Sequence, residues 1–297
     1  MKLILISLIL LILSKLNAQI IDSSNISYLN RIADGPNIAL DLKDNKLYAA
    51  GGSNFYIFDI SQPSSPDVLS KIVMPGFVDK IIVKDNLAFV LCWNHGVRII
   101  DISNSFHPFE IDYLSLSLSI INFKIVDSIL FAADVYDGLI IYDISDFNNP
   151  VIIGNYKTPG YGQDIDINGN YIYFADNYEG MHIFDISNPS QPQKLSTINP
   201  GQYIDRLLYR DNLVFAVDQD FGLRVIDVNN PSFPFELSNL SIPNTPRQIT
   251  LNGNFIYMGG HKLHIIDISD VHHPSILNSY GDYLYTAEVK SKGSYVY

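Results

Sequence analysis

The sequence repeats itself with a period of 42 residues. An apolar residue, an Asp and a second apolar residue recur six times, and successive aspartates are separated by 42, 42, 42, 42 and 40 residues. A fixed period of about 40–45 residues in an all-β chain is typical of the blades of a β-propeller. The six motifs are Phe58-Asp59-Ile60, Ile100-Asp101-Ile102, Tyr142-Asp143-Ile144, Phe184-Asp185-Ile186, Ile226-Asp227-Val228 and Ile266-Asp267-Ile268.

Each copy contains the signals for four short antiparallel strands. In residues 160–199 an Asn-Gly turn follows the first apolar segment, and a proline-bounded connection precedes the last one. These turn residues accept the backbone angles of tight hairpins, and they recur in register in the other copies. The mature chain has no helical periodicity of useful length, so we predict an all-β fold. The strands expected in this copy are 163–167, 171–176, 181–185 and 193–198.

The two ends of the chain resemble parts of one further blade. Residues 27–32 align with the fourth strands, residues 286–290 with the first strands, and residues 295–297 with the start of a second strand. We therefore predict a seven-bladed propeller whose last blade is incomplete and is closed by the N-terminal strand. Because that blade lacks a third strand, we expect the sequence to be a truncated piece of a seven-bladed protein. The alternative is a six-bladed ring with a ragged tail.

Residues 1–18 have the pattern of a secretory signal peptide. Lys2 precedes an apolar run from Leu3 to Leu13, and the small residue Ala18 ends the segment. The run is shorter than the ~18–20 apolar residues that span a bilayer, and every later apolar run is interrupted within about eight residues. We therefore expect a secreted or cell-envelope protein with no transmembrane span, in which residues 19–297 form a single propeller domain. An uncleaved anchor is the alternative.

Charge and cysteine content exclude several classes of function. The chain has 19 basic and 31 acidic residues, and removal of residues 1–18 changes its net charge from −12 to −14. Nucleic acids and anionic membranes require a basic face, so neither is an expected partner, whereas cations and basic partners are permitted. Cys92 is the only cysteine. The chain therefore has no intrachain disulfide and no cysteine-based metal cluster.

The copies resemble the LVIVD-repeat family of secreted β-propellers, whose signature is an apolar run that ends in Asp. The resemblance covers essentially the whole chain after residue 18. It implies a secreted or surface repeat protein and no particular reaction. The segments that carry it are Val97-Arg98-Ile99-Ile100-Asp101, Leu139-Ile140-Ile141-Tyr142-Asp143, Leu223-Arg224-Val225-Ile226-Asp227 and Leu263-His264-Ile265-Ile266-Asp267.

One face of the predicted propeller varies between copies. In an up-and-down blade, the loops between strands 2 and 3 and between consecutive blades lie on the same face. Those loops carry acids and aromatics, which suit a protein or carbohydrate partner. Turn geometry alone explains the residues of the opposite face. The predicted binding residues are Trp93, His95, Tyr136, Asp137, Tyr178, Glu179, Asp220 and Phe221.

The same face supplies a candidate metal site. If the first strands line a central channel, Asp79, Asp164 and Asp205 approach its mouth. Converging carboxylates suit a hard cation such as Ca²⁺, which takes six to eight oxygen ligands. No other cofactor is expected. The sequence contains no nucleophile elbow, phosphate loop or paired-cysteine motif, so we predict no catalytic residue.

Other aspartates are expected to be structural. Asp134, Asp176 and Asp218 each have a Gly four residues later, which predicts that each carboxylate caps its own loop. The six aspartates of the repeat motif precede turns bounded by proline. We expect each of them to accept backbone N–H groups.

Together these patterns predict a secreted or cell-surface scaffold, monomeric, that binds a partner through the variable loop face. A calcium-dependent hydrolase or lactonase with its site at the channel mouth is the alternative. A purely structural repeat of a surface layer is a third reading.

Overall fold

The computed structural model describes residues 3–6, 18–22, 25–27, 38–199, 203–242, 247–281 and 288–297. These ranges contain strands, turns and loops but no helix, so none is long and apolar enough to cross a membrane. Most of the predicted signal peptide, residues 1–18, lies outside them.

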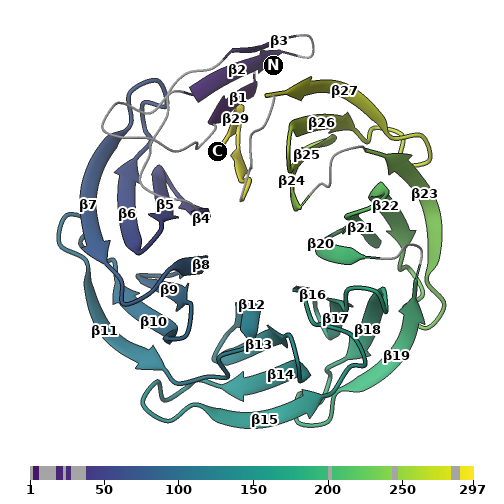
Figure 1. The fold of residues 1–297 in the computed structure, drawn as a ribbon, viewed down its shortest axis with the longest axis horizontal. Helices are drawn as coiled ribbons and strands as arrows, with labels where there is room; N and C mark the ends of the chain where they lie inside the picture. The colour runs from purple at the N-terminus through teal and green to yellow at the C-terminus, as the bar shows by residue number, and fades with distance from the viewer. Residues whose placement is uncertain are drawn as a thin grey trace. The chain divides into compact units, whose positions relative to one another are not determined.

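Six four-stranded antiparallel sheets follow one another along the chain, which confirms the all-β, propeller-type fold class (Figure 1). In every sheet the strands pair in chain order, so the first and fourth strands form its two edges. The first three blades are β4 (Ile38–Lys43), β5 (Lys46–Gly51), β6 (Asn54–Asp59) and β7 (Asp67–Val73); β8 (Val78–Lys84), β9 (Leu87–Cys92), β10 (Gly96–Asp101) and β11 (Phe109–Leu114); and β12 (Ile120–Val126), β13 (Ile129–Asp134), β14 (Gly138–Asp143) and β15 (Val151–Tyr156). The next three are β16 (Asp164–Asn168), β17 (Tyr171–Ala175), β18 (Met181–Asp185) and β19 (Gln193–Ile198); β20 (Ile204–Arg210), β21 (Leu213–Asp218), β22 (Gly222–Asp227) and β23 (Phe235–Ser241); and β24 (Gln248–Asn252), β25 (Phe255–Gly259), β26 (Leu263–Asp267) and β27 (Ser275–Tyr280).

A further sheet joins the two ends of the chain, but it is not a seventh four-stranded blade. It has five strands in the order β28 (Ser291–Lys292), β29 (Tyr295–Val296), β1 (Leu3–Ile6), β2 (Ala18–Asp22) and β3 (Asn25–Ser27). β1 pairs with β29 in parallel, whereas all pairs in an up-and-down blade are antiparallel. The observed count is therefore six complete blades, the alternative of the sequence analysis. Most of the expected N-terminal strand, residues 27–32, lies outside the described residues.

The chain divides into two compact units. The first contains Met1–Leu118, Thr250–Ile266 and Ile276–Tyr297, and the second contains Ser119–Ile249 and Asp267–Ser275. The blades β12–β15, β16–β19 and β20–β23 lie in the second unit. The blades β4–β7 and β8–β11 and the end sheet lie in the first.

The second and third strands of the blades form the core. β17 and β18 are buried on both faces, because their blade packs against blade β12–β15 on one side and against blade β20–β23 on the other, all in the second unit. For example, Phe174 and Phe184 meet edge-on at 6.0 Å, and Tyr173 stacks on Tyr209 of the next blade at 5.1 Å between ring centroids. Burial on both faces explains why these strands are continuous apolar runs. Cys92 is buried among them, and desolvation raises the pKa of its thiol to about 12.

The repeat motif is a turn-forming device. In all six copies the Asp carboxylate accepts the backbone N–H of the residue two positions later, at 2.7–2.9 Å, as expected. The apolar residue between them is buried, and in five copies its N–H donates to a carbonyl of the hairpin between strands 1 and 2. The backbone N–H and the hydroxyl of Ser145 hold the pKa of Asp143 below its usual value. The motif thus ties the two connections at one end of the blade together.

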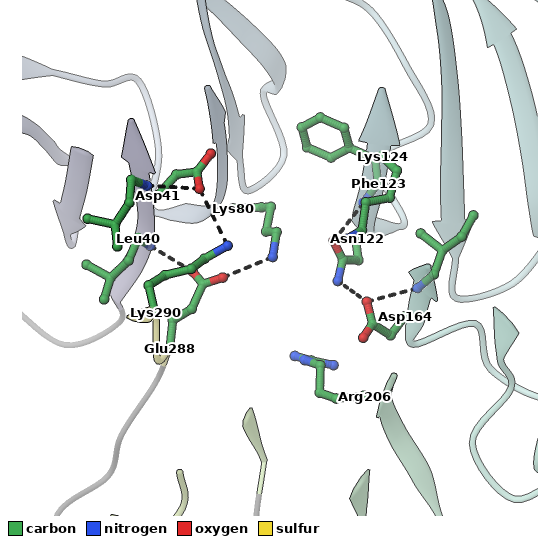
Figure 2. Close-up of polar contacts among 12 residues, drawn as sticks. Leu40, Asp41, Lys80, Asn122, Phe123, Lys124, Asp164, Arg206, Glu288 and Lys290 are labelled. Atoms are coloured by element: carbon green, nitrogen blue, oxygen red, sulfur yellow. Dashed lines mark hydrogen bonds and ion pairs between the residues drawn. The ribbon is translucent and has the colours of Figure 1, made fainter. Parts of the chain in front are cut away.

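The last ten residues connect blades of the first unit through hydrogen bonds and ion pairs. Glu288 accepts the backbone N–H of Leu40 at 2.7 Å and forms an ion pair with Lys80 at 3.0 Å, and Lys290 lies 3.5 Å from Asp41 (Figure 2). Although burial alone raises the pKa of Glu288, the two ammonium groups and the N–H of Leu40 outweigh it and hold that pKa below 4.5.

The apolar side chains of this segment complete two cores. Tyr297 is buried against blade β4–β7, and Val289 and Val296 are buried against blade β24–β27. The backbones of Lys290 and Tyr297 exchange hydrogen bonds of 2.8 and 2.6 Å. The C-terminal segment therefore packs against both of these blades.

Acids on the first strands make the same kind of link between blades in both units. Asp41 accepts the N–H of Val83, one blade further, at 2.7 Å. In the second unit Asp166 accepts the N–H of Tyr209 at 2.7 Å and pairs with Lys124 at 3.0 Å. A carboxylate on the first strand thus repeatedly forms a hydrogen bond to the next blade, and we call such a residue a fastener between blades.

We expect Glu288→Gln to lower the free energy of unfolding by about 1–3 kcal/mol, because an amide oxygen replaces a buried, charged acceptor of Lys80 and Leu40. Denaturant unfolding at neutral pH measures this change. The matched control is Glu110→Gln, which removes the more exposed pair with Arg98 and is expected to cost about 0–1 kcal/mol.

The difference between wild type and Glu288→Gln should also depend on pH. Because the folded-state pKa of Glu288 is lowered, its contribution is present above the unfolded-state pKa and is lost as the pH falls through the folded-state pKa. Equal costs for the two variants, or a difference that grows below pH 4.5, contradict the fastener role.

Candidate functional site

Five consecutive loops of the second unit each present one exposed aromatic side chain. They alternate between loops that join strands 2 and 3 of a blade and loops that join one blade to the next. We call this set the aromatic row. Its members, with their exposed fractions, are Tyr136 (67%), Tyr161 (42%), Tyr178 (42%), Tyr203 (38%) and Phe221 (46%).

Three of these rings touch in sequence. Tyr136 and Tyr161 meet edge-on, with ring centroids 6.5 Å apart, and Tyr161 and Tyr178 meet edge-on at 5.5 Å. A side-chain hydrogen bond with Tyr161 raises the pKa of Tyr178. The order of contacts shows that loops from two blades form one continuous surface.

Asp176 holds the two central loops together. Its buried carboxylate accepts the Thr158 hydroxyl at 2.6 Å and the Gly160 N–H at 2.9 Å, and it lies 3.0 Å from Nε2 of His182. The expectation that Asp176 caps its own loop is therefore wrong. Two of its partners, Thr158 and Gly160, lie in the preceding inter-blade loop, so it positions Tyr161 against Tyr178.

Asp134 behaves as expected. Its carboxylate accepts the N–H groups of Tyr136 and Asp137 at 2.9 Å each, and it also accepts the hydroxyl of Ser119. A Cβ at Gly162 would lie 2.6 Å from the Asp134 carbonyl oxygen. A glycine is required there, because the loop that carries Tyr161 passes directly over the loop that carries Tyr136.

Asp205 holds the loop of Tyr203. It accepts the side-chain amides of Gln219 and Asn177, the latter at 3.4 Å. The Gln219 N–H donates to the Tyr203 carbonyl at 3.0 Å. Desolvation raises the pKa of Asp205.

The last loop of the row is organised by Asp218, which caps it as expected. The carboxylate accepts the N–H groups of Asp220 and Phe221 at 3.0 and 3.3 Å and pairs with Arg224 at 3.1 Å. The Arg224 guanidinium lies over the Phe221 ring, 4.7 Å from its centroid. One face of the Phe221 ring is therefore in contact with the buried Arg224 cation.

The predicted binding residues fall in both units. Tyr136, Asp137, Tyr178, Glu179, Asp220 and Phe221 lie in the loops of the aromatic row. Trp93 and His95 are exposed in the first unit, where the ring centroids of Trp93 and Phe77 are 6.5 Å apart. The two sets are described separately, because each belongs to its own unit.

The sequence analysis did not select Phe77, Tyr161 and Tyr203. They lie at one position of the repeat, since Tyr161 and Tyr203 are separated by 42 residues and Phe77 precedes Tyr161 by twice that distance. Aromatic residues at a fixed repeat position were the available signal. Only the structure shows that this position lies next to the aromatics of the neighbouring loops.

The three aspartates of the predicted metal site have different surroundings. Asp79 is exposed in the first unit. In the second unit, Asp164 is buried, and its carboxylate accepts the side-chain amide of Asn122 (Figure 2). It also accepts the N–H groups of Ile165 and Leu207. No group of three or more His, Cys, Asp or Glu side chains is placed to hold a metal ion in the described residues. The contacts of Asp164 are those of a fastener between blades.

Comparison with known proteins identifies the repeat. The model of the LVIVD repeat matches residues 39–74, 75–113, 128–158, 159–199, 209–242 and 245–282. The chain belongs to the LVIVD-repeat family. The six matches follow the six observed blades, and the LVIVD signature is the third strand that ends at the turn-forming Asp. No curated protein matches the chain.

Solved structures share the propeller fold at low sequence identity. A functionally unknown protein from Desulfotomaculum acetoxidans is 11% identical with a TM-score of 0.76, and the alignment covers 92% of this chain and 94% of that one. The computationally designed Ika8 protein is 13% identical with a TM-score of 0.68, over 97% and 91% of the two chains. The β-propeller domain of Cps50 (Swd1) from Myceliophteria thermophila is 12% identical with a TM-score of 0.66, over 84% and 88%.

We expect Tyr161→Phe to lower the pKa of Tyr178 toward its ordinary value of 10.0, because the variant removes the hydrogen bond between the two hydroxyls. NMR titration of tyrosines labelled at the ζ carbon measures the change. Tyr136→Phe is the control, since it keeps the ring contact with Tyr161 and should leave the Tyr178 pKa in place. An unchanged pKa in Tyr161→Phe contradicts the contact between the two loops.

Proposed function

We propose that this LVIVD-repeat protein is a secreted or cell-surface scaffold that binds a protein or carbohydrate partner on the face formed by its 2–3 and inter-blade loops. The observation that carries the proposal is the aromatic row. Exposed tyrosines from consecutive loops touch one another, and buried carboxylates hold those loops in place.

The row has the properties of a preorganised interface. Tyr and Phe supply large contact areas with little loss of side-chain freedom, and aromatic residues are enriched where proteins bind partners. Because Asp134, Asp176 and Asp218 already fix the loops, binding would not have to order them.

Propellers of known structure add general support for a scaffold. A chain in the crystal structure of the mitotic checkpoint complex is 12% identical to this one with a TM-score of 0.70, over 86% of this chain and 83% of that chain. That chain belongs to a multiprotein assembly, so the fold is compatible with such a role. The alternative of a calcium-dependent hydrolase draws no comparable support from the contacts of Asp79, Asp164 and Asp205.

Secretion is proposed from the N-terminal sequence, in which Lys2 and an apolar run precede Ala18. The expected result is that the protein exported by its native host begins at Gln19, as measured by mass spectrometry of its N-terminal peptide. A mature protein that retains Lys2 contradicts the proposed cleavage.

The binding face is tested by the double variant Tyr136→Ala, Tyr178→Ala. Wild-type protein is immobilised, exposed to an extracellular extract of the source organism, and the retained material is quantified. We expect the double variant to retain about one tenth of the material that wild type retains, or less, because central aromatic anchors carry much of the binding energy of an interface.

The matched control is Phe233→Ala, Phe235→Ala, which removes two rings that are 76% and 52% exposed in the same unit but outside the row. Both variants should show the same circular dichroism spectrum and cooperative unfolding as wild type. Equal retention by the wild type and both variants contradicts a binding role for the row.

A further inference from the structure

We propose that the aromatic row binds a Lys- or Arg-rich segment of a protein partner. This inference rests on the proposed function and specifies the chemistry of the partner. The contacts and charges around the row carry it.

An acidic residue lies next to three of the exposed aromatic residues in the sequence. Asp137, Glu179 and Asp220 are neighbours in sequence of Tyr136, Tyr178 and Phe221, and Asp137 and Asp220 are exposed. The five loops, taken over their described residues 134–138, 157–163, 176–180, 203–205 and 218–222, contain one basic residue, Lys157. Lys157 lies 3.4 Å from Asp137 with both side chains exposed, so it neutralises one acid only in part.

Further acids lie directly beneath this surface. Asp134, Asp176 and Asp218 are fully buried, and Asp205 is 6% exposed. Basic groups face three of them. His182 contacts Asp176, Arg224 pairs with Asp218, and the charges of Arg206 and Arg247 act on Asp205. The excess of carboxylates over basic groups gives the loop surface a negative potential, which attracts cationic partners and repels anionic ones.

The orientation of the rings also favours cations. Tyr136 and Tyr161 make an interplanar angle of 83°, and Tyr161 and Tyr178 one of 81°. Successive perpendicular rings do not form one flat platform on which a long sugar chain could stack. Separate ring faces next to carboxylates are instead suited to single guanidinium or ammonium groups, which bind over a ring face. Arg224 already occupies such a position below Phe221, 4.7 Å from its centroid.

The net charge of the whole chain acts in the same direction. With 31 acidic and 19 basic residues, the protein attracts basic segments from a distance and the attraction weakens as salt rises. General acidity alone does not select the row, however. The experiment must therefore compare acids within the row with acids outside it.

The probes are three defined molecules, each titrated into the purified chain by calorimetry. The first is a peptide that alternates Arg and Ser, the second replaces every Arg with Glu, and the third is the uncharged oligosaccharide cellohexaose. We expect the Arg-Ser peptide to bind, with an affinity that falls as salt is added, and the other two not to bind.

Two variants of equal charge locate the site. The first variant removes the acids beside the row and is expected to lower the affinity for the Arg-Ser peptide about tenfold or more. It is Asp137→Asn, Glu179→Gln, Asp220→Asn. The control removes three acids from hairpin turns at the other end of the strands. Asn tolerates the positive backbone φ of these turns, so the control variant should keep its fold and bind the Arg-Ser peptide like wild type. It is Asp85→Asn, Asp127→Asn, Asp211→Asn, at φ of 51°, 51° and 52°.

The outcomes separate this inference from the proposed function. If both triple variants lower the affinity for the Arg-Ser peptide equally, the inference is wrong, because binding then depends on the general acidity of the chain. If cellohexaose or the Glu-Ser peptide binds to wild type, and this binding is lost in Tyr136→Ala, Tyr178→Ala, the inference of a basic partner is wrong. The proposed scaffold role is then still supported. If no probe binds, the inference fails, and the retention experiment alone decides whether the row binds a partner.

Discussion

A hydrogen bond from a backbone N–H to a side-chain carboxylate is the interaction on which this structure depends. At the end of each third strand an Asp accepts the N–H of the residue two positions later and closes the turn. On the first strands, Asp41 and Asp166 use the same bond to reach the next blade. Charged acceptors form stronger hydrogen bonds than neutral ones, and each blade supplies its own.

The candidate site uses the same chemistry at the other end of the strands. Asp134 and Asp218 fix their own loops, whereas Asp176 reaches across to the inter-blade loop and brings Tyr161 against Tyr178. These carboxylates are buried, so water competes little for their hydrogen bonds. An acidic chain thereby combines rigid loops with a surface of exposed rings and carboxylates.

Sequence patterns predicted the repeated elements well and the ends poorly. The spacing of the motif located six blades, and the recurring turn residues predicted tight hairpins, in which Asp85, Gly169 and Gly253 have positive φ. Such features depend on neighbours within a few residues. The end sheet failed as a seventh blade because its pairing joins residues almost three hundred positions apart, and the repeat pattern does not specify the parallel contact between β1 and β29.

The sequence by itself determined the positions of the six repeated four-stranded units, the structural role of the repeat aspartates and the acidic, aromatic character of one loop face. These properties follow from local turn chemistry and from a period that every blade repeats. Only the tertiary structure decided that Glu288 fastens Leu40 and Lys80, that Asp164 contacts the strands of neighbouring blades, and that Tyr161 joins the row. Each of these contacts is made between different blades or between the two ends of the chain. It therefore depends on how the blades pack, which the local pattern of any one copy does not encode.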